Sequence, residues 1–558
     1  MTMVTGGQAL VRQLLRHGVR HVFGVPGVQL DWAVDVFNDV RDQIELIVPR
    51  HEQATSYMAD GYGRTTGSVG VCMVVPGPGV LNAMSGLATG YACSAPMMCI
   101  AGQIASPGIG NGFGMLHEVN DQSGMLANVT KWSGLARTPQ DVARMTRDAL
   151  HAAESTRTRP TAVEVPPDVL QAKAEVELHE LIEKRTPPAP EAAAVERAAA
   201  LLNSARFPVI YAGGGIVAAN ASQALTRLAE KIGAPVVMSE NGLGAISARH
   251  ELALPNLAGR ALLPHADVIL VAGSRFVTPR ALLSFNAPHA KFIYLNIEAA
   301  DALAPRQPGV DLIGDAAIGL SQLEAAVTKQ DRLRDATSAA AKARAWCTQQ
   351  LALLKPQMSW IEALRRAIPE DGILINELTQ VGYVAPLAYP VYGPRTFITP
   401  GYQGTLGYGM PTGLGAAIGN PDKVTVAISG DGGFGWNLQE LATAAKYSIP
   451  LIMVVFVDGA FGNVRRIQQE VFNRQIGTEL HNPDFHKLAD AFGVTSTRAN
   501  SPAELEAKIR EAGRAQRRGP LLIEVPVGEM PSPWHLINPY SKQPADTPPN
   551  PLGEPARP

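Results

Sequence analysis

The sequence predicts an α/β protein built from three consecutive doubly wound parallel-sheet domains. Its 558 residues exceed what one core usually holds, because domains of ~100 to 200 residues are the norm. Short apolar runs alternate with stretches of helical periodicity along the chain. This alternation is typical of parallel sheets that helices cover on both faces. Two segments of different composition divide the runs into three groups, which indicates three domains.

The first domain is expected over residues 1–184. Residues 65–116 within it lack Asp, Glu, Lys, Arg and His, which at first favours a membrane segment. Proline and glycine divide this stretch into pieces far shorter than the ~20 apolar residues that a spanning helix needs. We therefore interpret it as buried strands and helices, and its burial is compatible with a subunit interface. The predicted strands of this domain are 21–24, 44–48, 69–75, 97–101 and 161–165.

The second domain is expected over residues 190–330 and the third over residues 355–530. Residues 185–196, rich in Pro, Ala and Glu, are predicted to be a linker, and the charged, Ala-rich stretch 331–350 a connecting helix. The proline-rich tail, 541–558, predicts an extended strap or a disordered segment. The predicted strands are 208–212, 235–238, 268–272 and 292–296 in the second domain, and 372–376, 424–429, 451–457 and 521–525 in the third.

Composition narrows the function. Lys and Arg total 48 against 50 Asp and Glu, a formal charge of −2, so neither nucleic acid nor an anionic membrane is an expected partner. The four cysteines lack the spacing of a zinc site and indicate core thiols rather than a disulfide framework. The first twenty residues do not resemble a secretory signal, so the expected location is the cytoplasm.

The most informative motif lies in the third domain. Parallel strands joined by a crossover helix have their carboxyl ends at one edge of the sheet, where open α/β sheets bind ligands. Here a helical pattern over residues 436–447 separates two glycine-rich turns that each follow an apolar run. Asp431 and Asp458 are therefore expected to face one crevice, as oxygen ligands for a divalent cation beside phosphate-binding N–H groups. The two turns are Gly430, Asp431, Gly432 and Gly433, and Asp458, Gly459, Ala460, Phe461 and Gly462.

This pattern resembles the diphosphate-binding motif of thiamin-diphosphate-dependent enzymes, a Gly-Asp-Gly followed further along the chain by Asn-Asn. The resemblance implies thiamin diphosphate and Mg²⁺ as cofactors, with the metal bound by Asp431, Asp458 and the backbone carbonyl of Ala460. The remaining residues of both turns would contact the diphosphate. The Asn pair is replaced here by Val457 and Asp458, and the additional negative charge leaves the metal preference open.

Glu52 follows the apolar run 44–48 and begins a predicted helix that reaches about Arg64. By itself it is an acid in the first turn of a helix, which the helix dipole favours. In the family that this chain resembles, a glutamate in this setting hydrogen-bonds the aminopyrimidine N1′ and relays the proton that activates thiazolium C2. There the glutamate and the diphosphate site belong to different subunits. The resemblance thus implies a homodimer or homotetramer with active sites between subunits.

Further positions match the same family. Leu406 resembles the bulky apolar residue that bends the cofactor, and Gly404 the residue whose carbonyl accepts the 4′-amino hydrogen. Gln380 falls where acetolactate synthases have a cofactor-contacting Gln. On the substrate side, Gln29 lies where benzaldehyde lyase has a functional His. His117 lies where acetolactate synthase and benzaldehyde lyase both have Gln. A histidine there could act as an acid or base toward a carbonyl substrate.

The second domain carries a glycine turn, residues 213–215, directly after the run 208–212. It resembles the turn of the family's middle domain, which binds FAD in some members. Val277 and Thr278 stand where flavin-bearing acetolactate synthases have paired aspartates, and Asn296 replaces another Asp. FAD binding is therefore an alternative that we do not favour.

The whole pattern is closest to the acetolactate synthase, pyruvate oxidase and benzaldehyde lyase branch. It implies an acetolactate-synthase-like carboligase or lyase that acts on a 2-oxo acid or an acyloin through a C2 carbanion and an enamine. Two alternatives stay open. One is a benzaldehyde-lyase-like acyloin lyase or a 1,2-diketone hydrolase, and the other is a catalytically silent subunit that only binds the cofactor.

Overall fold

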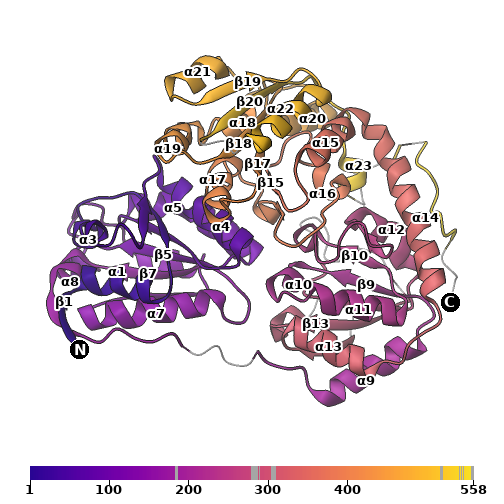
Figure 1. Cartoon of the computed structure of the whole chain (residues 1–558), viewed down its shortest axis with the longest axis horizontal. Helices are drawn as coiled ribbons and strands as arrows, with labels where there is room; N and C mark the ends of the chain where they lie inside the picture. Colours follow the sequence, from indigo (N-terminus) through magenta and orange to yellow (C-terminus); the bar gives the residue numbers. More distant parts are fainter. Residues whose placement is uncertain are drawn as a thin grey trace.

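The computed structural model describes residues 1–182, 187–277, 287, 289–302, 309–515, 519–538, 541, 543–544 and 546–554. Figure 1 shows three sheet-containing units in chain order, the first at the left, the second at the lower right and the third at the top. Each unit contains a six-stranded sheet, and every strand pair in these sheets is parallel. The predicted α/β fold of three parallel-sheet domains is confirmed.

The first sheet has the strand order β3-β2-β4-β5-β7-β6. A separate antiparallel pair, β1 with β8, joins the two ends of this unit. The strands are β1 Thr2–Thr5, β2 His21–Gly24, β3 Glu45–Ile47, β4 Gly70–Val74, β5 Met97–Gly102, β6 Trp132–Leu135, β7 Thr161–Val165 and β8 Lys173–Val176. The helices are α1 Gly6–Arg16, α2 Asp31–Val34, α3 Val36–Asp39, α4 Glu52–Thr66, α5 Pro78–Cys93, α6 Gln122–Ala127, α7 Pro139–Glu154 and α8 Pro167–Gln171.

The second sheet has the order β11-β10-β9-β12-β13-β14, the order of a dinucleotide-binding fold. Its strands are β9 Pro208–Ala212, β10 Val236–Met238, β11 Ala253–Leu254, β12 Val268–Ala272, β13 Lys291–Asn296 and β14 Gly309–Ile313. Its helices are α9 Ala192–Ser204, α10 Gly214–Ala218, α11 Ser222–Ile232, α12 Gly259–Leu262 and α13 Ala316–Ala326, and α14 Leu333–Leu351 leads to the third unit.

The third sheet has the order β16-β15-β17-β18-β20-β19, which repeats the topology of the first. Its strands are β15 Ile373–Asn376, β16 Phe397–Ile398, β17 Thr425–Gly430, β18 Leu451–Val457, β19 Thr495–Arg498 and β20 Leu521–Pro526. Its helices are α15 Lys355–Ala367, α16 Ala385–Ala388, α17 Gly409–Gly419, α18 Asp431–Phe434, α19 Leu441–Lys446, α20 Gly462–Phe472, α21 Phe485–Ala491, α22 Pro502–Arg514 and α23 Trp534–Ile537.

The strand order of the third sheet reverses between β15 and β17. In doubly wound sheets, ligands bind at such a switch point, beyond the carboxyl ends of the strands. The register pairs Asn376 with Ile428 across β15 and β17, and Gly430 with Phe456 across β17 and β18. The segments that follow these three strands therefore leave the sheet side by side.

Helix α4 of the first unit packs against α17 of the third, and the two units share one buried apolar cluster. Glycines allow the close approach of the two helices. A Cβ atom on Gly61 would lie 2.0 Å from the carbonyl oxygen of Thr412, and one on Gly415 would lie 1.9 Å from that of Met58. The helix that begins with Glu52 is thus fixed against the third unit of the same chain.

Several details differ from the sequence prediction. The expected linker 185–196 is shorter, because its Ala-rich end already belongs to α9. The expected helix over 436–447 is interrupted, and only α19 is α-helical there. The buried side chain of Asn437 donates to the carbonyl of Gly407 (2.7 Å) and to Gln53 Oε1 (3.1 Å), so tertiary contacts shape this segment. The domain boundaries stay predictions, and residue 184 lies outside the described residues.

The described part of the tail, beginning at residue 541, contains neither helix nor strand. The carbonyl of Pro548 accepts hydrogen bonds from Trp346 Nε1 (3.0 Å) and Gln350 Nε2 (3.4 Å) of α14. Figure 1 shows this segment alongside α14 at the right edge of the molecule. Among the described residues, no helix is both long enough and apolar enough to cross a bilayer.

Candidate active site

Asp431 is the first residue of α18, directly beyond the end of β17, and its side chain is only 3% exposed. Its Oδ1 accepts a hydrogen bond from the N–H of Gly432 (3.0 Å). Its Oδ2 accepts from the N–H of Gly459 (2.8 Å) and from Asn482 Nδ2 (2.6 Å). The carboxylate is therefore held in place by donors from three separate segments.

Asp458 lies in the turn after β18, next to Asp431. Its Oδ1 accepts from the N–H of Ala460 (3.2 Å), and its Oδ2 accepts from Gln380 Nε2 (2.8 Å). Burial, and then the negative charge of Asp431, raise the pKa of Asp458 to about 6. Two carboxylates thus repel one another here, and a divalent cation between them would remove that repulsion.

These residues fit a metal ion. Hard oxygen ligands suit Mg²⁺, which usually completes its coordination with water and substrate phosphates. Within the described part of the chain, no group of three or more His, Cys, Asp or Glu side chains could hold a metal. A cation beside Asp431 and Asp458 would take its other ligands from backbone carbonyls, such as that of Ala460, and from a diphosphate.

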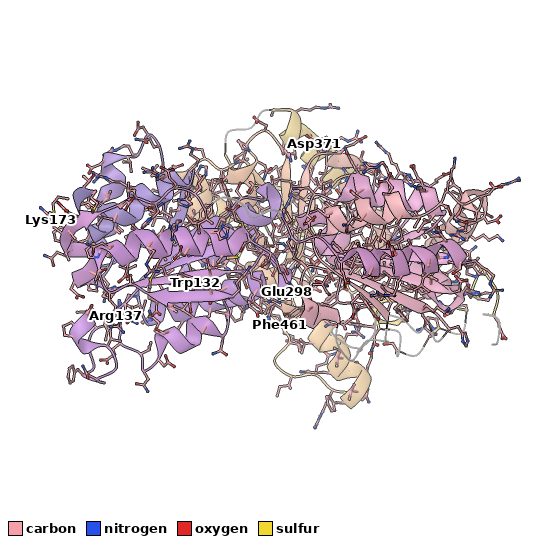
Figure 2. The ribbon with its side chains drawn as sticks, turned by 90° about the horizontal axis from the view of Figure 1, so that it is seen from below. Trp132, Arg137, Lys173, Glu298, Asp371 and Phe461 are labelled. Atoms are coloured by element: carbon pink, nitrogen blue, oxygen red, sulfur yellow. The ribbon has the colours of Figure 1, made fainter. Side chains whose placement is uncertain are left out.

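The turn after β18 is tied to the segment 478–480. Gly459 has φ +69° and its carbonyl accepts from the N–H of Leu480 (2.9 Å), while the N–H of Phe461 donates to the carbonyl of Thr478 (2.8 Å). A Cβ on Gly432 would lie 2.9 Å from the Phe461 ring, and one on Gly462 would lie 2.7 Å from Asp458 Oδ2. In Figure 2, Phe461 lies beside a helix that projects away from the sheets.

Residues 404–407 form the loop that is predicted to hold the cofactor in its bent shape. Gly404 and Gly407 both have positive φ, +56° and +81°, so the chain turns sharply on either side of Leu406. The Leu406 side chain is 36% exposed, so part of it is open to contact from a bound molecule. The N–H groups of Gly407 and Gly409 donate to the buried carboxylate of Glu377, at 2.9 and 2.8 Å.

The three predicted catalytic residues lie at the carboxyl edge of the first sheet. Glu52 begins α4, and its Oε2 accepts from Asn82 Nδ2 of α5 (2.9 Å). Gln29 follows β2 and donates from Nε2 to the carbonyl of Leu116 (3.3 Å). His117 has φ +70°, and its carbonyl lies 2.2 Å from where a Cβ on Gly77 would be.

Two buried polar atoms in this region have no hydrogen-bond partner, Oε1 of Gln29 and Nδ1 of His117. Such atoms are costly unless a ligand or water satisfies them. They lie on neighbouring segments, because Gln29 contacts the residue before His117. Polar groups without partners at the carboxyl edge of a parallel sheet are consistent with contact to a bound molecule.

The structure brings the predicted site residues together in two groups. Glu52, Gln29 and His117 belong to the first sheet, and the residues predicted to hold the cofactor's diphosphate and metal belong to the third. Among the contacts of the described residues, none joins the first group to Asp431 or Asp458. Within the chain, the first unit is linked to the third by Asn437, which contacts both Gln53 and Gly407, and also by the contacts of Tyr57 with Thr405 and of Arg50 with Glu440.

Sequence reasoning missed three polar residues of this region. Glu377 directly follows the apolar run 372–376, as Asp431 follows its own run, and this signal could have identified it. Ser429 donates from Oγ to Glu377 Oε2 (2.7 Å). Asn482 has no local signal, since it lies 51 positions beyond Asp431 in a segment without regular structure.

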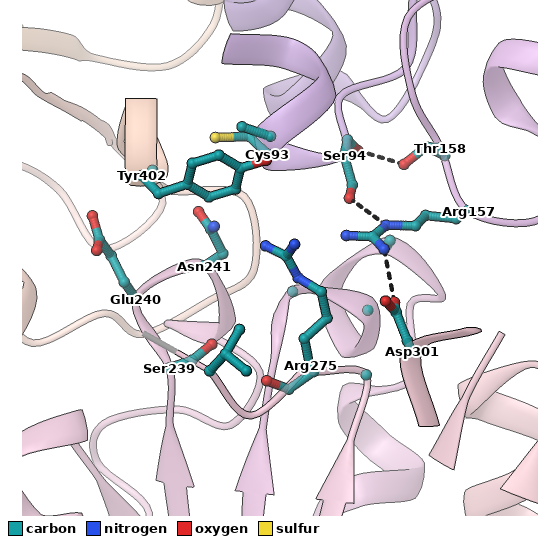
Figure 3. A pocket seen from close by; sticks show the side chains of 18 of the residues that line it. Cys93, Ser94, Arg157, Thr158, Ser239, Glu240, Asn241, Arg275, Asp301 and Tyr402 are labelled. Carbon is teal, nitrogen blue, oxygen red and sulfur yellow. Dashed lines mark hydrogen bonds and ion pairs between the residues drawn. The ribbon is translucent and has the colours of Figure 1, made fainter. Parts of the chain in front are cut away.

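A cavity of about 1510 Å³ lies between the second unit and the other two. Figure 3 shows Arg157 in this cavity, where its guanidinium donates to Ser94 Oγ (2.9 Å) and pairs with Asp301 (2.7 Å). The guanidinium of Arg275 lies 5.4 Å from the ring centroid of Tyr402. The glycine turn 213–215 borders the same cavity, and Thr278 lies outside the described residues.

Comparison with known proteins agrees with this arrangement of sheets and turns. The N-terminal TPP binding domain of thiamine pyrophosphate enzymes matches residues 4–125, their central domain residues 195–323, and their C-terminal TPP binding domain residues 379–525. Fold, site and these three matches together define the class: the chain belongs to the thiamine pyrophosphate (thiamin diphosphate) enzymes, and it is an enzyme that forms or cleaves C–C bonds with this cofactor.

Individual relatives are similar along nearly their whole length. The probable 2-ketoarginine decarboxylase AruI of Pseudomonas aeruginosa is 32% identical over 533 residues, which cover 94% of each chain. The large subunit of acetolactate synthase isozyme 3 of Escherichia coli K12 is also 32% identical, over 551 residues and 94% of each chain. The isozyme 1 large subunit of the same organism is 31% identical over 549 residues, 96% of each chain. The chain therefore lies in the acetolactate synthase branch of the family.

Proposed function

We propose that this protein is a carboligase or lyase that uses thiamin diphosphate and Mg²⁺ to act on a 2-oxo acid or an acyloin. The observation that carries the proposal is the proximity of Asp431 and Asp458 at the carboxyl edge of the third sheet: the N–H of Gly459, next to Asp458, donates to Asp431, and Gln380 donates to Asp458. The names of the relatives support the substrate class, since one is a 2-ketoarginine decarboxylase and the others are acetolactate synthases.

The roles of the residues follow from their chemistry. When bound, the cofactor supplies a carbon nucleophile for a carbonyl group. Asp431 and Asp458 would hold the metal on its diphosphate, and Leu406 would support its bent shape. The carboxyl group of Glu52, at the start of α4, would exchange a proton with the aminopyrimidine ring of the cofactor. Gln29 and His117 would face the substrate.

The proposal is tested by product analysis. Purified protein with thiamin diphosphate and Mg²⁺ is given pyruvate, 2-ketoarginine, benzoin and a 1,2-diketone in parallel, and the products are identified by NMR. Turnover of a 2-oxo acid or an acyloin with C–C bond change is the expected result. Binding of thiamin diphosphate without turnover of any of these compounds would contradict the proposal and favour a silent cofactor-binding subunit.

A second candidate is an acyloin lyase or a hydrolase of 1,2-diketones. The observation that favours it is the buried Nδ1 of His117, which has no hydrogen-bond partner and could act as a base toward water or an acyloin hydroxyl. In the same NMR experiment, cleavage of benzoin or the diketone without turnover of any 2-oxo acid would select this candidate. If pyruvate is the only compound consumed and acetolactate is its product, the acyloin lyase or diketone hydrolase is excluded.

We further propose a homodimer or homotetramer in which Glu52 of one subunit and Asp431 of another share an active site. Exposed apolar side chains near both groups support this: Phe113, Met115 and Leu116 in the first unit, and Leu406, Val464, Ile467, Val471 and Phe472 in the third. Mixing two inactive variants, Glu52→Gln and Asp431→Ala, tests it after subunit exchange. Shared sites predict partial recovery of activity, and sites within single subunits predict none.

For the central cavity we expect no flavin. Asn296 and Val277 stand where acidic residues are expected in flavin-bearing relatives, and Asn296 already donates to the carbonyl of Ser274 (3.3 Å). The protein as purified should therefore be colourless. Visible flavin absorption that persists through gel filtration, with released FAD identified by chromatography, would contradict this prediction.

A further inference from the structure

Glu377 stands beside the residues already assigned to the cofactor but has no role among them. It directly follows β15, at the switch point of the third sheet, and its side chain is 1% exposed. Its own N–H donates to the carbonyl of Ile428 on β17 (3.1 Å), so its backbone continues the ladder of the sheet. The side chain therefore starts from a rigid position.

Both oxygens of the carboxylate accept hydrogen bonds from the loop that carries Leu406. Oε1 accepts from the N–H of Gly407 (2.9 Å), and Oε2 accepts from the N–H of Gly409 (2.8 Å). The carbonyl of Gly407 is itself held by Asn437, which also reaches Gln53 of α4. The loop is thus fixed from both of its faces, by Glu377 on one and by Asn437 on the other.

The same carboxylate also contacts the turn over residues 429–433. Oε2 also accepts from Ser429 Oγ (2.7 Å), two positions before Asp431. A Cβ on Gly433 would lie 2.0 Å from Oε1, so only glycine leaves room for the carboxylate there. A single side chain therefore contacts the 404–409 loop and the 429–433 turn at once.

Among the described residues, no Lys, Arg or His side chain forms an ion pair with Glu377, and burial raises its pKa to about 7. A buried carboxyl group costs stability unless its hydrogen bonds are satisfied, and here all of its donors come from the two cofactor segments. An apolar side chain would fill the same space at lower cost, which suggests that the hydrogen bonds serve placement.

We propose that Glu377 is a positioning residue that sets the distance between the loop carrying Leu406 and the turn carrying Asp431. In the proposed function, on which this inference rests, the loop contacts the ring end of the cofactor and the turn binds its diphosphate. The position of Glu377 would then determine whether one thiamin diphosphate molecule can contact the loop and the turn at the same time. A change at Glu377 should therefore weaken the binding of thiamin diphosphate, which reaches both segments, more than the binding of inorganic diphosphate, which reaches only the turn.

The test compares two ligands on the full-length protein. Thiamin diphosphate and inorganic diphosphate, each with excess Mg²⁺, are titrated calorimetrically into wild type and Glu377→Gln. The amide keeps the size of the side chain but leaves at least one glycine N–H without an acceptor. We expect thiamin diphosphate to bind about tenfold more weakly or worse, because a hydrogen bond to a charged group is lost, and inorganic diphosphate to change less than about threefold.

Two further variants keep the result interpretable. Glu164→Gln is the matched control, because Glu164 is also a buried carboxylate with three side-chain donors, Gln103, Gln122 and Ser123, but belongs to the first sheet. It should leave both affinities unchanged. Ser429→Ala removes the hydrogen bond from Ser429 to Glu377. As a single change it should weaken thiamin diphosphate binding. Combined with Glu377→Gln it should add little, because both changes break the same connection between the loop and the turn.

Three outcomes would overturn the inference. They are equal losses of affinity for both ligands in Glu377→Gln, unchanged binding of both, and additive effects of Glu377→Gln and Ser429→Ala. A wild-type protein that binds inorganic diphosphate but not thiamin diphosphate would instead overturn the proposed function, and this inference with it.

Discussion

Gln380 donates from Nε2 to Asp458 Oδ2 at 2.8 Å and accepts with Oε1 from the N–H of Met530 at 2.7 Å. It thereby ties the second metal-ligand candidate to the segment after β20. The amide gives the carboxylate one donor but no positive charge, so the additional charge of Asp458 is only partly compensated. Where the family motif has a neutral Asn, this chain has an acidic candidate ligand that an amide orients.

Asp458→Asn should therefore separate metal binding from cofactor binding. Mg²⁺ alone should bind several-fold more weakly, because one of two attracting carboxylates is lost. Binding of thiamin diphosphate with saturating Mg²⁺ should change less, since the removed carboxylate no longer repels the diphosphate. Calorimetry with Mg²⁺ alone and with both ligands measures the difference. Asp484→Asn, a change at the exposed start of α21 in the same unit, is the control and should alter neither affinity.

Glu52→Gln should slow activation of the cofactor strongly while leaving its binding nearly intact. The amide oxygen can still accept from Asn82, but the side chain can no longer exchange a proton. We expect exchange of the C2 proton of bound thiamin diphosphate to slow ~100-fold or more, the usual contribution of a positioned acid or base. Quenched-flow deuterium exchange followed by NMR measures it. Glu45→Gln, on the exposed side of β3, should exchange at the wild-type rate. Identical rates in wild type and Glu52→Gln would favour a silent subunit.

Gly433→Ala should destabilise the turn over residues 429–433, which carries Asp431. The new Cβ would lie 2.0 Å from Glu377 Oε1, so the carboxylate and the turn must separate. Overpacking of a well-packed site costs about 1 to 3 kcal/mol of unfolding free energy, and thiamin diphosphate should no longer protect against thermal unfolding. Gly435→Ala is the matched control, since its nearest neighbour, the carbonyl oxygen of Asp431, lies 3.3 Å away. Equal melting temperatures and equal cofactor protection in both variants would contradict this explanation.

The carboxyl edge of the third sheet was largely predictable, for a local reason. Asp431 and Asp458 each follow a long apolar strand and lie in a glycine-rich turn. The strand, the turn and the candidate ligand are therefore consecutive in the sequence and can be recognised together. Gln380 and Leu406 have no such local pattern, and only the family resemblance identified them. Glu377 follows a strand as Asp431 does, but without glycine neighbours it resembles an ordinary acid at a strand end.

Other features depend on contacts that no local pattern encodes. Asn482 reaches Asp431 across 51 positions from a segment without regular structure. The edge strands β11 and β16 have two residues each, too few to show periodicity. The helix expected over 436–447 is broken because Asn437 bonds to the loop at Gly407, a tertiary contact that overrides helical propensity. Sequence patterns thus located the central strands of the three sheets and the turns that follow them, but they missed the edge strands β6, β14 and β19 as well.

The protonation of Glu440, a buried residue between α18 and α19, should contribute to the pH dependence of the free energy of unfolding. Both of its carboxylate oxygens accept from the N–H of Arg50 (3.1 Å each), two positions before Glu52, and Oε2 also accepts from Thr443 Oγ1 (2.5 Å). Burial raises its pKa from 4.5 to about 7. Between these values the folded protein keeps a proton on Glu440 that the unfolded chain has released.

The sign of the effect follows from this proton count. Because the folded state binds more protons, the free energy of unfolding should fall as pH rises from about 4.5 to about 7, and it should then level off. Glu440→Gln should remove this part of the slope. Thermal midpoints of the cofactor-free protein, measured across this pH range, provide the test. Glu370→Gln is the control, because pairing with Arg249 lowers the pKa of Glu370, so its own transition lies below this window. An unchanged slope in Glu440→Gln would show that the carboxyl group is ionised in the folded protein throughout the range.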